Sequence, residues 1–353
     1  MHAHDYSRYG QPTEEWLAIQ ATLPGAASLS TKEQAAVTRS VVNRWRDEAA
    51  ALAMKILGPK VSTADFSMPT RDGRMLPVRT YRTKEVLTSK SLPIYLHLHG
   101  GGFLFGTLDS EDATCARMAI DAEVLVVNVC YSHTPEHAYP TAWNDVEDSL
   151  GWLDSHAAIM HGQRERVIVG GISAGAWLAA SLLLQSTKRS GTCIIGQVLM
   201  IPCLVHPSCY GPRLGKSSSY EQNENAPILP FTRAREFSDL LDVAAPREDD
   251  IRLNPGNATA AQMQHLPPTV LSIAGLDILR DEGLHYAEML HMCGVPTDVN
   301  VFEGLPHGFR RFGERLSECK RWDSVLVDGI KWILGGPAYS EDFIIKTKET
   351  APE

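Results

Sequence analysis

Long apolar runs are missing from this sequence. Across its 353 residues, no stretch approaches the roughly 20 apolar residues with which a helix crosses a bilayer. The first residues, MHAHDYSRYGQPTEEW, contain neither the basic nor the apolar region of a secretory signal peptide. We therefore expect a cytoplasmic chain without stable membrane insertion.

An excess of positive charge is also missing. Lys and Arg number 33 and Asp and Glu 42, which gives a formal net charge of −9. Nucleic acids and anionic membranes bind to basic faces, so the charge excludes nucleic acid as a partner. A content of 44% hydrophobic and 21% charged residues is typical of a globular protein. The oligomeric state is not decided by composition, and a homodimer stays open.

Paired cysteine motifs are absent as well. The seven cysteines are odd in number and show no C-x-x-C spacing, which is typical of reduced thiols rather than of disulfides or a zinc site. His97 and His99 alternate along one run, but no carboxylate or cysteine cluster accompanies them in the sequence. We therefore expect no metal site and no cofactor.

From residue 61 onward, short apolar runs alternate with helical stretches. Such runs are typical of strands covered on both faces, and the alternation predicts a mostly parallel sheet with helices on both sides. The expected strands are Met75–Arg82, Pro93–His99, Glu123–Val129, Arg166–Gly170, Gln197–Ile201, Thr269–Ala274 and Thr297–Phe302. The expected helices are Asp112–Asp121, Ala142–His156, Ala174–Lys188, Asp281–Cys293 and Ser317–Leu334.

Two segments fall outside this alternation. Residues 1–60 read as helical, in two stretches (16–23 and 35–57) separated by a turn at Pro24-Gly25. Residues 206–264 are too long for a plain connection and contain an amphipathic helix candidate, Thr232–Asp242, although the polar SSSYEQNEN stretch could instead be a disordered loop. The domain prediction is a helical cap segment at 1–60, a catalytic domain at 61–205 and 265–340, a lid at 206–264 and a tail at 341–353.

A serine stands where an apolar strand gives way to a helix, in VIVGGISAGAWLA. Gly171 and Gly175 flank Ser173 at minus two and plus two, and each leaves room for a tight turn. Such a turn pushes the hydroxyl outward, and strain of this kind collects at functional sites. Read alone, the motif is equally consistent with an ordinary glycine-rich turn, so further residues must decide.

A nucleophilic serine needs oxyanion donors, a base and an acid. The strand at 93–98 is followed by HGGGF, whose glycines allow backbone N–H groups to approach one substrate oxygen. For the base, His307 lies on a Pro/Gly-flanked turn after the last strand, whereas His285 falls within a helix. For the acid, Asp277 follows the strand at 269–274, whereas Asp281 begins a helix, where the dipole favours negative charge.

Taken together and in order, HGGGF, GISAG, DILRDEG and PHGF resemble the hormone-sensitive-lipase-like family of the α/β-hydrolase fold, which includes carboxylesterases and arylacetamide deacetylases. YSHTPEHAYPTA, residues 131–142, resembles a further segment of that family, and the resemblance covers residues 65–335. It implies a serine carboxylesterase with a triad, an oxyanion hole and a cap formed by the N-terminus and the 206–264 insertion. The implied residues are Ser173 as nucleophile, His307 as base, Asp277 as orienter, and Gly101, Gly102 and Ala174 as oxyanion donors.

The sequence departs from the family pattern at positions that bear on the pocket. Ile172, Ala176-Trp177 and the tripeptide SHT at 132–134 replace residues that are usual there, the last replacing Arg-Leu-Ala. We expect Phe103 and Trp177 to wall an acyl pocket that takes short- to medium-chain or small aryl and alkyl esters, although Trp177 could equally face the core of its own helix. Two alternatives stay open: a transacylase or lactone-forming cyclase using the same acyl-enzyme, and a ligand-binding receptor on this scaffold.

Overall fold

A computed structural model describes residues 5–23, 29, 31–185, 192–210 and 218–348. Among these residues, no helix combines the length and apolarity needed to cross a membrane. The expected turn at Pro24-Gly25, the expected end of a helix at Lys188 and the first serine of SSSYEQNEN lie outside the described residues.

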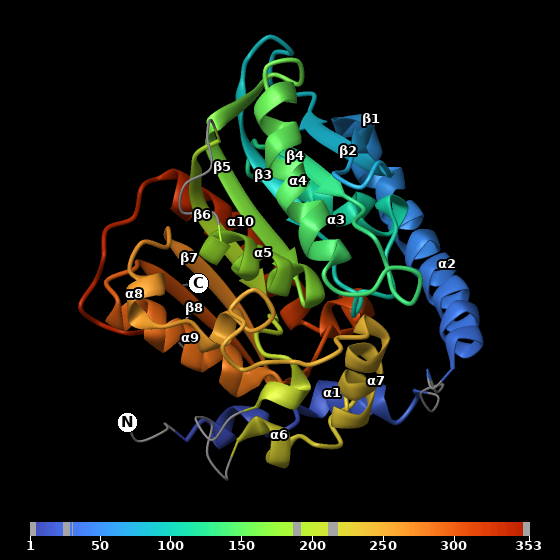
Figure 1. The fold of residues 1–353 in the computed structure, drawn as a ribbon, viewed down its shortest axis with the longest axis vertical. Helices are drawn as coiled ribbons and strands as arrows, with labels where there is room; N and C mark the ends of the chain where they lie inside the picture. Colours follow the sequence, from blue (N-terminus) through green and yellow to red (C-terminus); the bar gives the residue numbers. More distant parts are fainter. Residues whose placement is uncertain (1–4, 24–28, 30, 186–191, 211–217, 349–353) are drawn as a thin grey trace.

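Within the described residues, nine strands form one mostly parallel sheet in the order β1-β2-β4-β3-β5-β6-β7-β8-β9 (Figure 1). In this sheet the β1–β2 and β2–β4 pairs are antiparallel and the other pairs are parallel. The strands are β1 Val61–Pro69, β2 Met75–Thr83, β3 Leu92–Leu98, β4 Leu125–Val129, β5 Gly162–Ile172, β6 Ile194–Met200, β7 Thr269–Leu276, β8 Thr297–Pro306 and β9 Ile345–Lys346.

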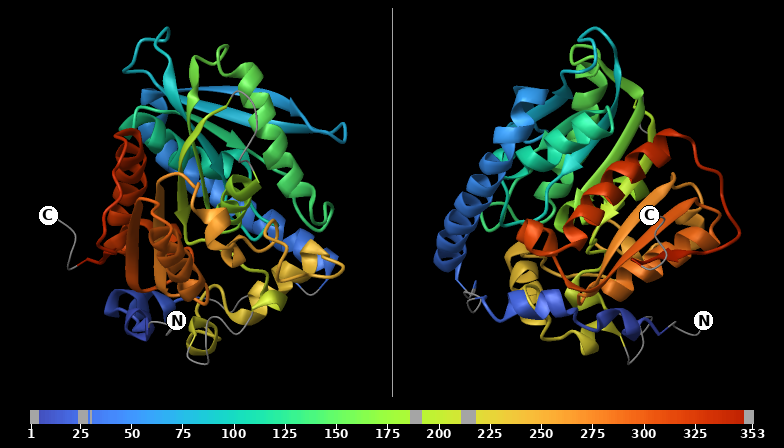
Figure 2. Two further views of the ribbon diagram at one scale, coloured as in Figure 1. Left: turned by 60° about the vertical axis from the view of Figure 1, so that its left-hand side comes forward. Right: turned by 180° about the vertical axis from the view of Figure 1, so that it is seen from behind.

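Helices cover both faces of the sheet, as predicted (Figure 2). α3 (Leu108–Asp121) and α10 (Glu318–Leu334) pack on one face, and α4 (Thr141–His156), α5 (Ala174–Gln185) and α9 (Arg280–Met292) pack on the other. β4 shows why its sequence is apolar at every position except Asn128. Leu125, Val127 and Val129 enter the core beneath α4 and α5, while Val126 enters the core beneath α3 and α10.

Elements that differ from the sequence-based expectation include β1, α3 and β9, and β9 lies in the stretch expected to be a tail. β1 was not predicted, because this edge strand exposes most of its residues on both sides and so lacks an apolar pattern. α3 begins at Leu108 rather than Asp112, because Thr107 and Ser110 form a capping box: each side chain bonds the backbone N–H of the other residue.

The two segments outside the alternation meet the carboxyl ends of the strands. Figure 1 shows α1 (Glu14–Gln20), α6 (Ser219–Gln222) and α7 (Phe231–Leu241) together at that end, with α2 (Lys32–Leu57) along one side. The N–H of Thr13 donates to the carbonyl of Gly304 at the end of β8, 3.5 Å away. The expected amphipathic helix of the insertion is α7, α6 lies within the stretch that could have been a disordered loop, and α8 spans Ala260–Met263. Short 3-10 helices span Ser7–Gly10, Gly58–Lys60, Pro207–Cys209, Pro255–Asn257 and Phe309–Arg315.

Candidate active site

Ser173 occupies the one-residue turn between β5 and α5. Its φ of 56° lies in the left-handed region, which is costly for a residue with a Cβ, and its N–H donates to the carbonyl of Met200 at 2.8 Å. Both flanking positions must be glycine, because a side chain at either one would collide with neighbouring backbone. A Cβ on Gly171 would lie 2.3 Å from the backbone of Gly175, and a Cβ on Gly175 would lie 2.0 Å from the carbonyl oxygen of Leu98. The GISAG motif therefore encodes a compressed strand–helix turn.

Three predicted residues meet in one chain of hydrogen bonds. Ser173 Oγ lies 2.8 Å from Nε2 of His307, and Nδ1 of His307 lies 2.7 Å from Oδ2 of Asp277. They follow the ends of β5, β8 and β7, which point the same way in the parallel sheet. The other carboxylate oxygen of Asp277 accepts the N–H of Leu279 at 3.1 Å, so the buried carboxylate is held at both oxygens.

The competing candidates lie elsewhere. His285 sits on α9 with its ring 4.0 Å from Glu288. Asp281 lies in the first turn of α9, as predicted, where it pairs with Arg280 at 2.6 Å and accepts the N–H of Ser219 at 2.7 Å. Both residues therefore interact with partners other than Ser173 and His307.

The glycine loop after β3 packs against the serine turn. Gly101 and Gly102 have φ of 141° and 60°, and a Cβ on Gly100 would lie 2.8 Å from the carbonyl oxygen of Ile172. Ala174 is the first residue of α5, so its N–H belongs to the helix turn that has no intrahelical acceptor. The arrangement places the glycine loop against the turn that carries Ser173.

One face of α2 fixes the glycine loop, which the sequence did not indicate. The side chain of Arg46 donates to the carbonyl of Gly100 at 3.1 Å. The side chain of Asn43 accepts the N–H of Gly106 at 2.9 Å, and Asp47 accepts the Thr107 hydroxyl at 2.6 Å. Positions 43, 46 and 47 share a helix face, so a single helix holds the loop at three points.

Aromatic side chains surround the loop. Phe103 stacks on Trp143 with ring centroids 4.9 Å apart and meets Trp177 edge-on at 5.6 Å. Trp177 is buried, and its indole N–H donates to the carbonyl of Leu253 at 2.7 Å. Phe237 of α7 lies over Gly102, where a Cβ would come within 2.6 Å of the ring. Phe237 was not singled out from the sequence, and the amphipathic helix that carries it was the available signal.

A second carboxyl group is buried near Asp277. Burial, and then the negative charge of Asp277, raise the pKa of Glu282 to about 8, although bonds donated by the Tyr220 hydroxyl and the Leu204 N–H oppose the rise. Glu282 therefore keeps its proton near neutral pH. Its two hydrogen bonds join α9 to Leu204, just before the 206–264 insertion, and to Tyr220 within it.

The structure corrects the reasoning about metal ligands. The expectation of no metal site assumed that His97 and His99 lack a cysteine neighbour, but folding brings Cys130 and His133 to His99, with one potential ligand atom each and all three within 4.8 Å. His97 instead bonds Glu111 at 3.0 Å. Burial lowers the pKa of His99 well below its usual range and that of His133 to about 4.

Comparison with known proteins bears on the family and the fold. A family described as the alpha/beta hydrolase fold matches residues 95–311. Esterase LipI of Mycobacterium tuberculosis is 32% identical over 76% of this chain and 80% of its own length, and ethyl acetate hydrolase of Pseudomonas putida is 31% identical over 76% and 82%. Among solved structures, vibralactone cyclase superposes with a TM-score of 0.83 over 93% of this chain and 96% of its own, but at 24% identity it bears on the fold alone. With motifs, sheet and sequence relatives in agreement, the chain belongs to the hormone-sensitive-lipase-like carboxylesterases of the α/β-hydrolase fold and is a carboxylic ester hydrolase.

Proposed function

We propose that this carboxylesterase works through an acyl-enzyme on Ser173. His307 takes the Ser173 proton as the hydroxyl attacks the ester carbonyl, and Asp277 holds the imidazole with its Nδ1–H directed at the carboxylate. The alcohol leaves with the proton from His307, and a water molecule activated by the same ring then releases the acid. The observation that carries the proposal is the continuous Ser173–His307–Asp277 hydrogen-bond chain.

The negative oxygen of the tetrahedral intermediate would be bound by the N–H groups of Gly101, Gly102 and Ala174. Their support is the contact between the glycine loop and the serine turn, together with the free first-turn N–H of α5. Removing one such donor costs about 10²–10³ in kcat in other serine hydrolases. No metal ion takes part in these steps.

Residues 1–60 and 206–264 would form a cap over the acyl group, and the substrates would be short- to medium-chain or small aryl and alkyl esters. The contact of Phe237 with the glycine loop supports a closed cap. Large rings at Phe103 and Trp177 leave little length for an acyl chain. The ethyl acetate hydrolase among the relatives is named for an ester of this size.

The test is a panel of 4-nitrophenyl esters of increasing acyl length with matched variants. Ser173→Ala and His307→Ala should each lower turnover by several orders of magnitude, because neither the nucleophile nor its base has a substitute. His285→Ala is the control, and it should keep wild-type turnover. Near-normal turnover in a folded Ser173→Ala protein would overturn the mechanism, and a preference for chains beyond about ten carbons would overturn the substrate size.

The same acyl-enzyme could pass its acyl group to an alcohol. Adding a primary alcohol to the assay and measuring ester against acid among the products separates the two reactions. Release of mainly acid supports hydrolysis, and ester as the main product at low alcohol concentration identifies a transacylase. A protein that binds esters without turnover would instead be a receptor.

A further inference from the structure

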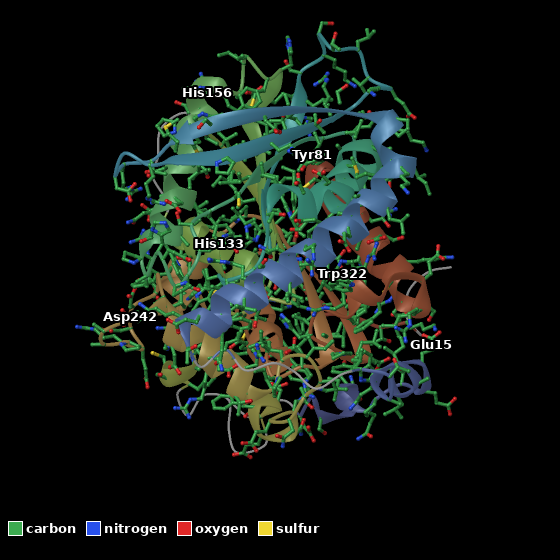
Figure 3. All side chains as sticks on the ribbon, turned by 90° about the vertical axis from the view of Figure 1, so that its right-hand side faces the viewer. Glu15, Tyr81, His133, His156, Asp242 and Trp322 are labelled. Atoms are coloured by element: carbon green, nitrogen blue, oxygen red, sulfur yellow. The ribbon has the colours of Figure 1, made fainter. Side chains whose placement is uncertain are left out.

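His99 and Cys130 leave the sheet side by side. β3 and β4 are parallel neighbours in which Leu98 lies opposite Val129, so the next residue of each strand emerges at the same edge. Three residues later the chain brings His133 back to His99, with the two Nε2 atoms 3.3 Å apart. Figure 3 labels His133, which lies next to α2. Strand register therefore creates a cluster of two imidazoles and one thiol.

The separation of the nitrogens suits a shared ion. Two histidine nitrogens at tetrahedral zinc, each about 2.0–2.1 Å from the metal, are about 3.3 Å apart. The Cys130 sulfur and one ring nitrogen of each histidine lie within 4.8 Å of one another, compared with about 3.5 Å between nitrogen and sulfur ligands at tetrahedral zinc. Sulfur and imidazole ligands together favour zinc-like ions over magnesium or calcium.

The His99 ring is already oriented for this role. Its Nδ1–H can donate to the carbonyl of Gly100 at 3.3 Å, and the ring stacks on Tyr131 with centroids 4.3 Å apart. These contacts leave the lone pair of Nε2 directed at His133. A hydrogen bond from the far nitrogen to a carbonyl is the usual support of a metal-binding histidine.

The cluster is reached from solvent through Cys130 and His133, while His99 lies buried behind them. A cavity of about 440 Å³ is lined by Cys130 and His133, and it provides an entry path and room for a water ligand. Three guanidinium groups on this side of the molecule have carboxylate partners: Arg39 pairs with Glu136 at 2.5 Å, Arg46 with Glu111 at 2.6 Å and Arg74 with Asp145 at 2.8 Å.

We propose that His99, Cys130 and His133 bind one zinc-like divalent ion, with water as the fourth ligand, and that the bound ion inhibits the esterase. Binding releases the thiol proton of Cys130 to solvent, while the proton of His133 moves from Nε2 to Nδ1. The ion then ties His99, and with it the carbonyl of Gly100, to the 130–133 segment. The inhibitory half rests on the proposed function, since it assumes that the glycine loop binds the oxyanion.

Metal binding is measured without substrate, so its failure is distinguishable from failure of the esterase mechanism. Protein treated with a chelator is titrated with Co²⁺, and we expect one equivalent to give a thiolate-to-cobalt absorption band that Zn²⁺ removes. Cys130→Ser should abolish the band, and His133→Gln should weaken binding by at least about tenfold, since losing only an outer partner already costs 10–100-fold. Cys293→Ser is the matched control. Absence of the band in the wild type, or its survival in Cys130→Ser, overturns the site.

Inhibition is measured on the best 4-nitrophenyl ester. Zn²⁺ should inhibit the wild type and Cys293→Ser at the same concentration, whereas Cys130→Ser and His133→Gln should need at least about tenfold more, in line with their weaker binding. Without added metal, all four proteins should have similar turnover. Equal zinc sensitivity in all four would overturn the inhibitory role.

Discussion

Glu282→Gln tests whether a protonated carboxyl group is built into the fold near Asp277. Glutamine keeps the shape of the protonated acid, and its carbonyl can still accept the N–H of Leu204. Burial raises the pKa of Glu282 from 4.5 to about 8, so the folded protein holds a proton that the unfolded chain releases. Because the folded-state pKa is the higher one, the contribution of Glu282 to stability is fully present below pH 4.5 and is lost as pH rises through about 8.

The size of the effect follows from that interval. Between pH 4.5 and about 8, each pH unit weakens the folded state by about 1.4 kcal/mol, which amounts to about 5 kcal/mol above pH 8. Glutamine does not ionise, so the variant does not lose this stability as pH rises. The variant should therefore gain stability relative to the wild type as pH rises, with most of the gain between pH 5 and 8.

Urea denaturation at a series of pH values from 5 to 9 measures the difference. The free energy of unfolding of Glu282→Gln minus that of the wild type should rise from pH 5 to about 8 and level off above it. Glu165→Gln, at an exposed position of β5, is the control and should give a difference that does not change with pH. A flat profile for Glu282→Gln would refute the burial of a protonated carboxyl group.

Two further variants test the candidate site. Asp277→Asn should lower ester turnover far more than Asp281→Asn, because Asp277 bonds the His307 ring whereas Asp281 pairs with Arg280, and a reversal of the two effects in steady-state assays would mean that the acid is wrongly assigned. Trp177→Ala should lower the free energy of unfolding by about 3–5 kcal/mol, as removal of a buried large ring does. If Trp177 walls the acyl pocket, the same variant should also favour longer esters, by about fourfold in kcat/KM for each added methylene, from about 0.8 kcal/mol of transfer free energy. An unchanged chain-length profile would exclude Trp177 as that wall.

The central strands were predictable because they are buried on both faces. β4, β6 and β7 are mostly apolar along their whole length, and their positions agree with prediction to within a few residues. β1 could not be found in this way, since most of its side chains face solvent. Its place in the sheet depends on pairing with β2, which is a tertiary contact that no local pattern encodes.

The candidate site also has parts that could be predicted from sequence and parts that could not. Ser173, Asp277 and His307 could be named from sequence because each follows a strand, and the carboxyl ends of parallel strands share one edge. The hydrogen bond from Arg46 to the glycine loop could not be predicted from sequence, because it joins a helix to a loop 54 residues away. The meeting of His99 with Cys130 needs the register of β3 against β4, which becomes known only once the sheet is assembled.

The order of strands in the sheet also has a consequence for synthesis of the protein. From β5 to β9, spatial order follows chain order, so each new strand can join the exposed edge of the strand made just before it. Folding during translation proceeds from the N-terminus, and the residues before β5 already include α2 and the loop it fixes. Asp277 and His307 arrive on the last long strands. A nascent or truncated chain ending before β8 would therefore display Ser173 without a base, and esterase activity would begin only when the protein is nearly complete.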